Sequence, residues 1–255
     1  MRRYSLPLVI LISIVIAACL TGLALAEGRA ESTPLAAFKR VDVTGMAVID
    51  LVQDTNGPLL VSLPDDAKVS IDVKVQKETL FIRAADGRRW WDNLFGGGPT
   101  GPARITLHFK DLESIDVAGG VRITAREIRV PALRIGGSGG TTIQIDELQA
   151  TTLTIDGSGA LKAELNGKVT DQNISISGAA DYRGAKLISD NASVDVSGAG
   201  KIVVNVSKKL NANISGAGVV EYIGDPVVKQ NVSGVGRVKR RETAEIGGPH
   251  IAARE

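Results

Sequence analysis

Residues 191–218 read NASVDVSGAGKIVVNVSKKLNANISGAG, and this stretch decides the fold. Apolar and polar residues alternate through it. The apolar residues that keep one parity within their strands are Val194, Val196, Ile202, Val204 and Val206, followed by Leu210, Ala212 and Ile214. A period of two is typical of strands with one buried face, whereas an amphipathic helix places apolar residues three or four apart. The stretch therefore predicts short β-strands.

The same stretch belongs to an internal repeat in which an apolar residue and a small or polar one precede a glycine. The glycines that end this motif are Gly119, Gly137, Gly157, Gly178, Gly198, Gly216 and Gly234. They are separated by 18, 20, 21, 20, 18 and 18 residues, and Val43-Thr44-Gly45 resembles an earlier copy. A unit of this length cannot bury its own apolar face, so neighbouring units must stack. The repeat predicts an all-β fold, a single-stranded β-helix or β-solenoid with coils of about 18–21 residues.

Glycine is expected at the coil corners because it adopts positive φ and tolerates close stacking. A phosphate-binding loop is disfavoured, since no helix follows these glycines. Serine precedes the repeated glycine at positions 177, 197, 215 and 233, and this serine ladder is predicted to hydrogen-bond the corner backbone.

The residues that could carry chemistry form no recognisable constellation. Asp156, Asp181 and Asp195 lie near successive corners but at different places in the repeat, so no general acid and base are paired. The two histidines, His108 and His250, are isolated and give no metal-binding spacing or catalytic triad. The sequence predicts no catalytic residues, no metal and no cofactor.

The amino terminus has the features of an export signal. Arg2 and Arg3 precede a long apolar stretch, and residues 24–26 form the small-x-small pattern that predicts cleavage between Ala26 and Glu27. Two alternatives stay open: acylation of Cys19, which ends a lipobox-like sequence, and an uncleaved membrane anchor. After cleavage at Ala26 the protein would hold no cysteine and therefore no disulfide.

The charge balance excludes one class of partner. The chain has 30 Lys and Arg against 28 Asp and Glu, and two of the basic residues lie in the export signal. The remainder is neutral, so nucleic acid bound through a broad basic field is not expected. Contact with a membrane is expected only through an uncleaved or lipidated amino terminus.

Two segments interrupt or follow the repeat. Residues 84–104 form a predicted loop that holds Trp90, Trp91 and Phe95, and it either contacts a ligand or partner or covers the solenoid as a lid. After the last repeat, Arg237 and residues 239–241 form a basic cluster that is expected to discourage addition of further strands at the open edge. The cluster could instead bind an anionic envelope polymer.

The chain resembles the bacterial head-GIN-domain family, whose members are described as heads of auto-transporter adhesins and otherwise have no known function. The resemblance runs from about residue 38 to residue 241. It includes FKRVDVTGMAVIDLVQ (residues 38–53), ARITLHFKDLESIDVAGGVRI (103–123) and, most specifically, NISGAGVVEYIGDPVVKQNVSGVGRVKR (213–240). It implies a secreted or envelope-associated β-helix-like fold and no catalytic residues.

Together these observations divide the chain into a signal peptide (1–26), a short linker (27–37), a β-solenoid domain (38–241) with an inserted loop, and a polar tail (242–255). The expected function is that of an exported, non-enzymatic envelope protein that binds a polysaccharide or a surface or periplasmic protein. A periplasmic scaffold protein and a polysaccharide-active β-helix enzyme are the alternatives.

Overall fold

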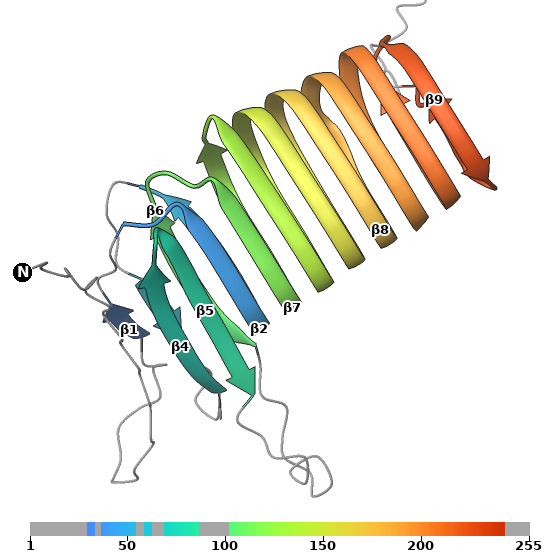
Figure 1. Ribbon diagram of the computed structural model, residues 1–255. Helices are drawn as coiled ribbons and strands as arrows, with labels where there is room; N and C mark the ends of the chain where they lie inside the picture. Colours follow the sequence, from blue (N-terminus) through green and yellow to red (C-terminus); the bar gives the residue numbers. More distant parts are fainter. Residues whose placement is uncertain (1–29, 34–36, 55–58, 63–68, 87–101, 243–255) are drawn as a thin grey trace, which may run out of the picture.

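The computed structural model describes residues 30–33, 37–54, 59–62, 69–86 and 102–242 (Figure 1). These residues are all-β and contain no helix; their ten strands form one sheet that does not close on itself. The strands are β1 (Ala30–Thr33), β2 (Arg40–Gln53), β3 (Leu59–Ser62), β4 (Val69–Gln76), β5 (Thr79–Asp86), β6 (Ala103–Phe109), β7 (Ser114–Arg129), β8 (Ala132–Ile223), β9 (Val227–Gly234) and β10 (Arg237–Arg240). The all-β prediction is confirmed.

Most of the sheet is parallel and has the regular register that the repeat predicts. β2 pairs with β7, and β7 pairs with the start of β8, residue by residue and without a bulge as far as Ala125. In Figure 1 the 92-residue β8 doubles back repeatedly, and its successive stretches lie side by side. We call each stretch from one stacked glycine to the next a pass.

The amino-terminal end does not follow chain order. β2 lies between β7 on one side and β5 and β6 on the other, where β5 pairs with Arg40–Gly45 and β6 with Ala47–Gln53. β5 and β6 thus share one layer, in which β5 pairs with the first half of β2 and β6 with the second half. The antiparallel strands β4 and β3 lie outside this layer (Figure 1). The interruption is shorter than the predicted 84–104, because β5 extends to Asp86 and β6 begins at Ala103.

A row of eight glycines with positive φ aligns the passes. The members of this glycine ridge are Gly45, Gly119, Gly139, Gly159, Gly178, Gly198, Gly216 and Gly234. A Cβ on Gly198 would lie 2.2 Å from the carbonyl oxygen of Gly178, and each of the other members from Gly119 onward meets its predecessor in the same way, at 2.7 Å or less. Glycine is required here both by its backbone conformation and by the close approach of the next pass.

The ridge corrects the sequence-based alignment at two positions. Gly137 and Gly157, which we expected at the corners, are not among the positive-φ glycines; Gly139 and Gly159 take that place. Gly137 instead pairs in register with the buried Val117 and occupies a position that faces inward. From Gly119 onward the ridge steps are 20, 20, 19, 20, 18 and 18 residues, which is more even than the predicted spacing.

The interior is filled by the residues that alternate inward along the passes, chiefly Ile, Val and Leu. One buried polar network interrupts this apolar core. The hydroxyl of Tyr182 donates to Oε1 of Gln172 at 3.1 Å, Nε2 of Gln172 donates to Oγ of Ser189 at 2.6 Å, and Ser189 donates to the carbonyl of Asn205 at 2.8 Å. Burial raises the pKa of Tyr182, so its hydroxyl stays protonated and serves as a donor.

At the carboxyl-terminal end an ionic clasp holds the last strand. Glu221 on β8 is buried, and its carboxylate lies 3.0 Å from Nζ of Lys239, 3.1 Å from Nζ of Lys201 and 3.8 Å from Nη1 of Arg241. Burial by itself would raise the pKa of Glu221, but hydrogen bonds from Lys239 and Lys201 lower it below its ordinary value. The basic cluster thus directs part of its charge inward, where it fixes β10 to the preceding pass.

The ridge yields a prediction for two adjacent glycines. Gly139→Ala should lower the free energy of unfolding by about 3 kcal/mol, because it forces a side chain into positive φ and against the Gly119 carbonyl, 2.7 Å away. Gly140→Ala should leave stability unchanged or raise it by up to about 1 kcal/mol, since a Cβ there meets no atom within 4 Å. Urea unfolding of both variants measures the difference. Equal losses would contradict the assigned register.

The clasp yields a second prediction. Glu221→Gln should cost about 2 kcal/mol of unfolding free energy at pH 7, because the two lysines lose their anionic acceptor. The folded pKa of Glu221 is lowered, so its stabilisation is complete above the unfolded pKa and is lost as the pH falls through the folded pKa. The variant and the parent protein should therefore converge in stability in strong acid.

The matched control is Asp225→Asn. The Asp225 side chain is 92% exposed and 3.4 Å from Nη1 of Arg240, so removing its charge should change stability by less than about 0.5 kcal/mol. If the two variants have the same effect at pH 7, the clasp does not stabilise the end of the sheet.

Candidate functional site

One face of the passes carries two regular rows of outward-pointing side chains beside the glycine ridge. The serine row holds the residue just before each ridge glycine: Thr44, Ala118, Ser138, Ser158, Ser177, Ser197, Ser215 and Ser233. The acid row holds the third residue before each ridge glycine: Asp42, Asp116, Gly136, Asp156, Ser175, Asp195, Asn213 and Asn231. We call the two rows together the small-polar face, because every side chain in them is short.

The serine row differs from its prediction. Its hydroxyls are exposed, and within the described chain only Ser138 bonds the backbone of a neighbouring pass, with Oγ 3.4 Å from the carbonyl oxygen of Val117. The predicted ladder of bonds to the corner backbone is wrong, because the positive-φ glycines turn the corner by themselves. The hydroxyls stay directed at the solvent.

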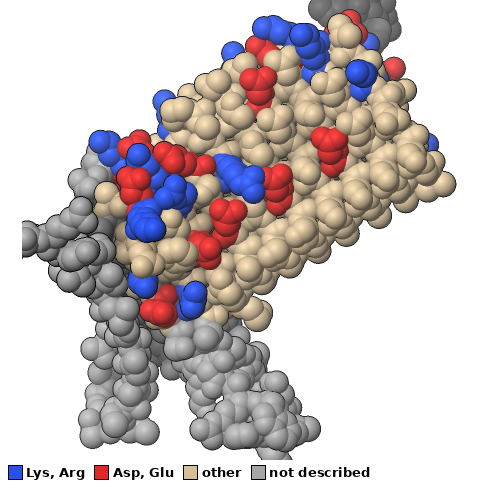
Figure 2. Space-filling model, viewed as in Figure 1, with Lys and Arg blue, Asp and Glu red and all other residues tan. Residues whose placement is uncertain are grey.

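The acid row contains two aspartates, Asp156 and Asp195, that the sequence-based alignment placed at different positions of the repeat. Asp156 and Asp195 both lie three residues before a ridge glycine, so they occupy the same place on different passes. Asp181 follows the ridge instead and pairs with Arg183 on another surface, with Oδ2 2.8 Å from Nη2. Figure 2 shows separate acidic side chains in a line along the passes, beside a broad band without charged residues.

The small-polar face is hollowed around Gly136. The acid row lacks a side chain there, and a Cβ on Gly136 would lie 2.3 Å from Oδ1 of Asp116 and 4.0 Å from Nη2 of Arg134. The hollow has a volume of about 430 Å³. Its polar side chains include Asp42, Asp116, Arg134, Asp156, Ser158 and Ser177, and the backbone of residues 136–138 also lines it. We call it the glycine hollow.

Few of the polar groups in the glycine hollow have a partner among the residues that the structure describes. Arg134 forms an ion pair with Asp156. No hydrogen bond or ion pair joins the side chains of Asp42, Asp116, Ser158 or Ser177 to any residue that the structure describes. Carboxylates that accept and hydroxyls that both accept and donate therefore line a concave surface that is open to solvent.

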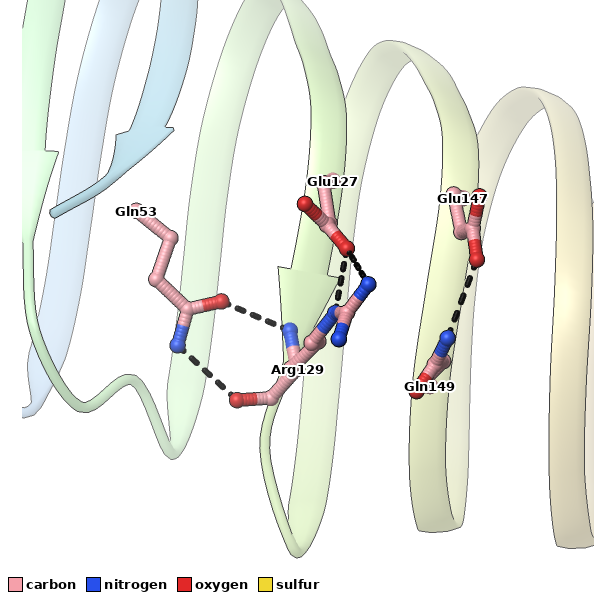
Figure 3. Close-up of polar contacts among 5 residues, drawn as sticks. All are labelled: Gln53, Glu127, Arg129, Glu147 and Gln149. Carbon is pink, nitrogen blue, oxygen red and sulfur yellow. Dashed lines mark hydrogen bonds and ion pairs between the residues drawn. The ribbon is translucent and has the colours of Figure 1, made fainter.

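A larger hollow, of about 810 Å³, lies at another corner and has a different character. Figure 3 shows that Gln53 bonds the backbone of Arg129 from both ends of its amide: Oε1 accepts from N at 2.6 Å, and Nε2 donates to O at 2.8 Å. Nε2 also lies 3.1 Å from the carbonyl oxygen of Lys110, and Arg129 pairs with Glu127. These groups hold neighbouring passes together, so this corner is structural.

The described residues contain no group of three or more potential ligands that could hold a metal ion. Within them, His108 lies with Nδ1 2.6 Å from Oδ2 of Asp54 and does not line the glycine hollow. The hollow thus combines acceptors, hydroxyls and one guanidinium without a histidine. Such a set can bind a polar ligand by many hydrogen bonds.

Several residues singled out from the sequence lie outside the described part of the chain. These are the loop aromatics Trp90, Trp91 and Phe95, the cleavage pair Ala26 and Glu27, the lipidation candidate Cys19, and His250. Among the described residues no helix is long and apolar enough to cross a membrane. Sequence reasoning missed Asp116, Arg134 and Gly136; the available signal was the run of extra glycines at 136–140, which has more glycine than one corner requires.

Comparison with known proteins identifies the family. The sequence profile of the family described as "Putative auto-transporter adhesin, head GIN domain" matches residues 37–226. No curated protein matches the chain. The profile match confirms the resemblance to the head-GIN-domain family that the sequence motifs indicated.

Solved structures share the fold. A crystal structure described as a putative adhesin from Bacteroides fragilis superposes with a TM-score of 0.73 at 20% identity, over 84% of this chain and 97% of that chain. A protein described as a putative lipid binding protein from Parabacteroides distasonis gives 0.60 at 17% identity, over 84% and 96%. One described as a putative adhesin from Parabacteroides merdae gives 0.58 at 16% identity, over the same shares. With the profile match covering most of its length, the chain belongs to the head GIN domain family.

Proposed function

We propose that the protein is an exported, non-enzymatic component of the bacterial cell envelope that binds an envelope or surface polysaccharide through its small-polar face. The observation that carries this proposal is the set of unpaired carboxylates and hydroxyls in the glycine hollow, on a face built from short side chains. Membership of a family described as adhesin heads agrees with a binding role. The apolar leader over residues 1–26 supports export.

We further infer that the passes are the coils of a single-stranded β-solenoid. The even ridge steps, the parallel register of β2, β7 and β8, and the carbonyl-to-glycine stacking support this interpretation. A solenoid presents equivalent side chains about 4.8 Å apart along its axis. A polymer with a repeating structure would then meet the same chemical groups on successive coils, which favours polysaccharide over a small isolated ligand.

Two alternatives differ in what they require of the small-polar face. A periplasmic scaffold protein would dock another protein and would not need free acceptors in a hollow. A polysaccharide-active enzyme would need an acid and a base placed around one bond, and its carboxylates would be those of Asp42 and Asp116, which pair in register on neighbouring strands. Release of new reducing ends from the polysaccharide distinguishes such an enzyme from a protein that only binds.

We predict that the exported protein, produced from its complete gene, sediments with delipidated, protein-free polysaccharide prepared from the envelope of the producing bacterium. Heat-unfolded protein is the control for nonspecific adsorption. The pelleted polysaccharide should release no new reducing ends during the incubation. Native protein that stays in the supernatant would contradict the proposal, and release of reducing ends would favour the enzyme.

A second arm of this experiment tests location. Protease added to intact cells should digest the protein if it binds at the outer surface, with a periplasmic protein as the protected control. Protection on intact cells together with binding to the envelope polysaccharide would place the binding role inside the envelope.

A further inference from the structure

We propose that the glycine hollow is a binding site for one or two uncharged sugar residues of the polysaccharide chain. This inference rests on the proposed function and names the ligand class and the place where it binds. The hollow is distinguished from the rest of the small-polar face by one missing side chain, that of Gly136, between Asp116 and Asp156 in the acid row.

The first argument is shape. Oδ1 of Asp116 lies over Gly136 from one neighbouring pass, 2.3 Å from where a Cβ would be, and Arg134 approaches the same point along the pass of Gly136. The resulting volume of about 430 Å³ lies in the lower part of the range for pockets that bind small molecules. It suits a short piece of a chain, while the flat rows on either side leave room for the chain to continue.

The second argument is hydrogen-bonding chemistry. Each sugar hydroxyl both donates and accepts, and adjacent hydroxyls can donate together to the two oxygens of one carboxylate. Asp42 and Asp116 offer such carboxylates without any partner among the described residues, and Ser158 and Ser177 offer hydroxyls of the same dual character. A polyhydroxylated ligand therefore satisfies every type of group that the hollow presents.

The third argument is charge. The hollow contains three carboxylates, those of Asp42, Asp116 and Asp156, and a single guanidinium, that of Arg134, which is paired with Asp156. A uronic acid or a phosphate-bearing polymer would meet two uncompensated negative charges and be repelled. A cationic peptide would be attracted by the acids but would leave the serine hydroxyls unused and face the guanidinium. An uncharged sugar avoids both conflicts.

The fourth argument is contrast with the corner hollow at Gln53. That space is larger, yet Gln53, Glu127 and Arg129 are engaged with one another or with the backbone of adjacent passes (Figure 3). A ligand there would have to break bonds that hold passes together. In the glycine hollow the side chains of Asp42, Asp116, Ser158 and Ser177 have no partner among the described residues, so a ligand that bonds them need not break a bond between described passes.

The test fills the hollow without disturbing the fold. In Gly136→Leu the new Cβ would meet the end of the flexible Asp116 side chain, and Gly136 does not have positive φ, so the backbone tolerates the change. The matched control is Gly140→Leu, the same substitution where a Cβ meets no atom within 4 Å and which does not line the hollow. Thermal unfolding of both variants should give the melting temperature of the parent protein.

Binding is measured by calorimetry with defined probes: neutral trisaccharides of glucose, galactose, mannose and N-acetylglucosamine, a trigalacturonate and trilysine. At least one neutral trisaccharide should bind, and Gly136→Leu should weaken that binding by at least about tenfold while Gly140→Leu leaves it unchanged. Asp116→Asn should weaken it as well, because an amide nitrogen cannot accept a sugar hydroxyl proton. Neither charged probe should bind more tightly than the neutral one.

The other outcomes overturn the inference in distinguishable ways. Tightest binding of trilysine would replace the sugar with a cationic peptide, and tightest binding of trigalacturonate would contradict the charge argument. If envelope polysaccharide still sediments with the protein but Gly136→Leu has no effect, the hollow is not the site although the proposed function stands. If neither polysaccharide nor trisaccharide binds, both proposals fail.

Discussion

The close approach of one ridge glycine to the carbonyl of the glycine before it is the constraint on which the rest of the structure depends. At Gly178, Gly198 and Gly216 a Cβ would lie within about 2.4 Å of that oxygen, so no other residue fits. Because each pass must return to this contact, its length from Gly119 onward is restricted to 18–20 residues. The restriction aligns equivalent side chains on every pass and thereby creates both the buried interior and the regular outer rows.

The small-polar face is a direct consequence of that alignment. The residue just before each ridge glycine points outward, the second residue before it points into the core, and the third residue before it points outward again, as strand geometry requires. Short side chains at both outward positions make the face flat, and the missing side chain at Gly136 then lowers it locally. The hollow thus forms by the loss of a side chain from a regular array, without any added loop.

The two ends of the sheet solve the problem of exposed strand edges differently. At the amino-terminal end the antiparallel strands β4 and β3 lie against β5 and β6. At the carboxyl-terminal end β9 and β10 are the last described strands, and Val227 and Val235 are 76% and 84% exposed. The buried carboxylate of Glu221 gathers Lys201, Lys239 and Arg241 there, so ion pairs add to the packing of Val238 against the core in holding the last strand.

The sequence by itself determined the all-β class, the repeat length and the family. It could do so because stacking requires the same local pattern in every pass: alternating apolar and polar residues and one glycine. It placed the ridge correctly at Gly178, which has no glycine close by, and at Gly198, but was wrong by two residues at Gly137 and Gly157, where a second glycine two residues later offered another alignment and has the positive φ. Only the register with Val117 decided between them. Two further features depended on the tertiary structure. One is the position of β2 between β7 and the β5–β6 layer, and the other is the cluster of Asp116, Arg134 and Asp156 around Gly136. Both join residues from separate passes, and no local sequence pattern encodes which passes pair.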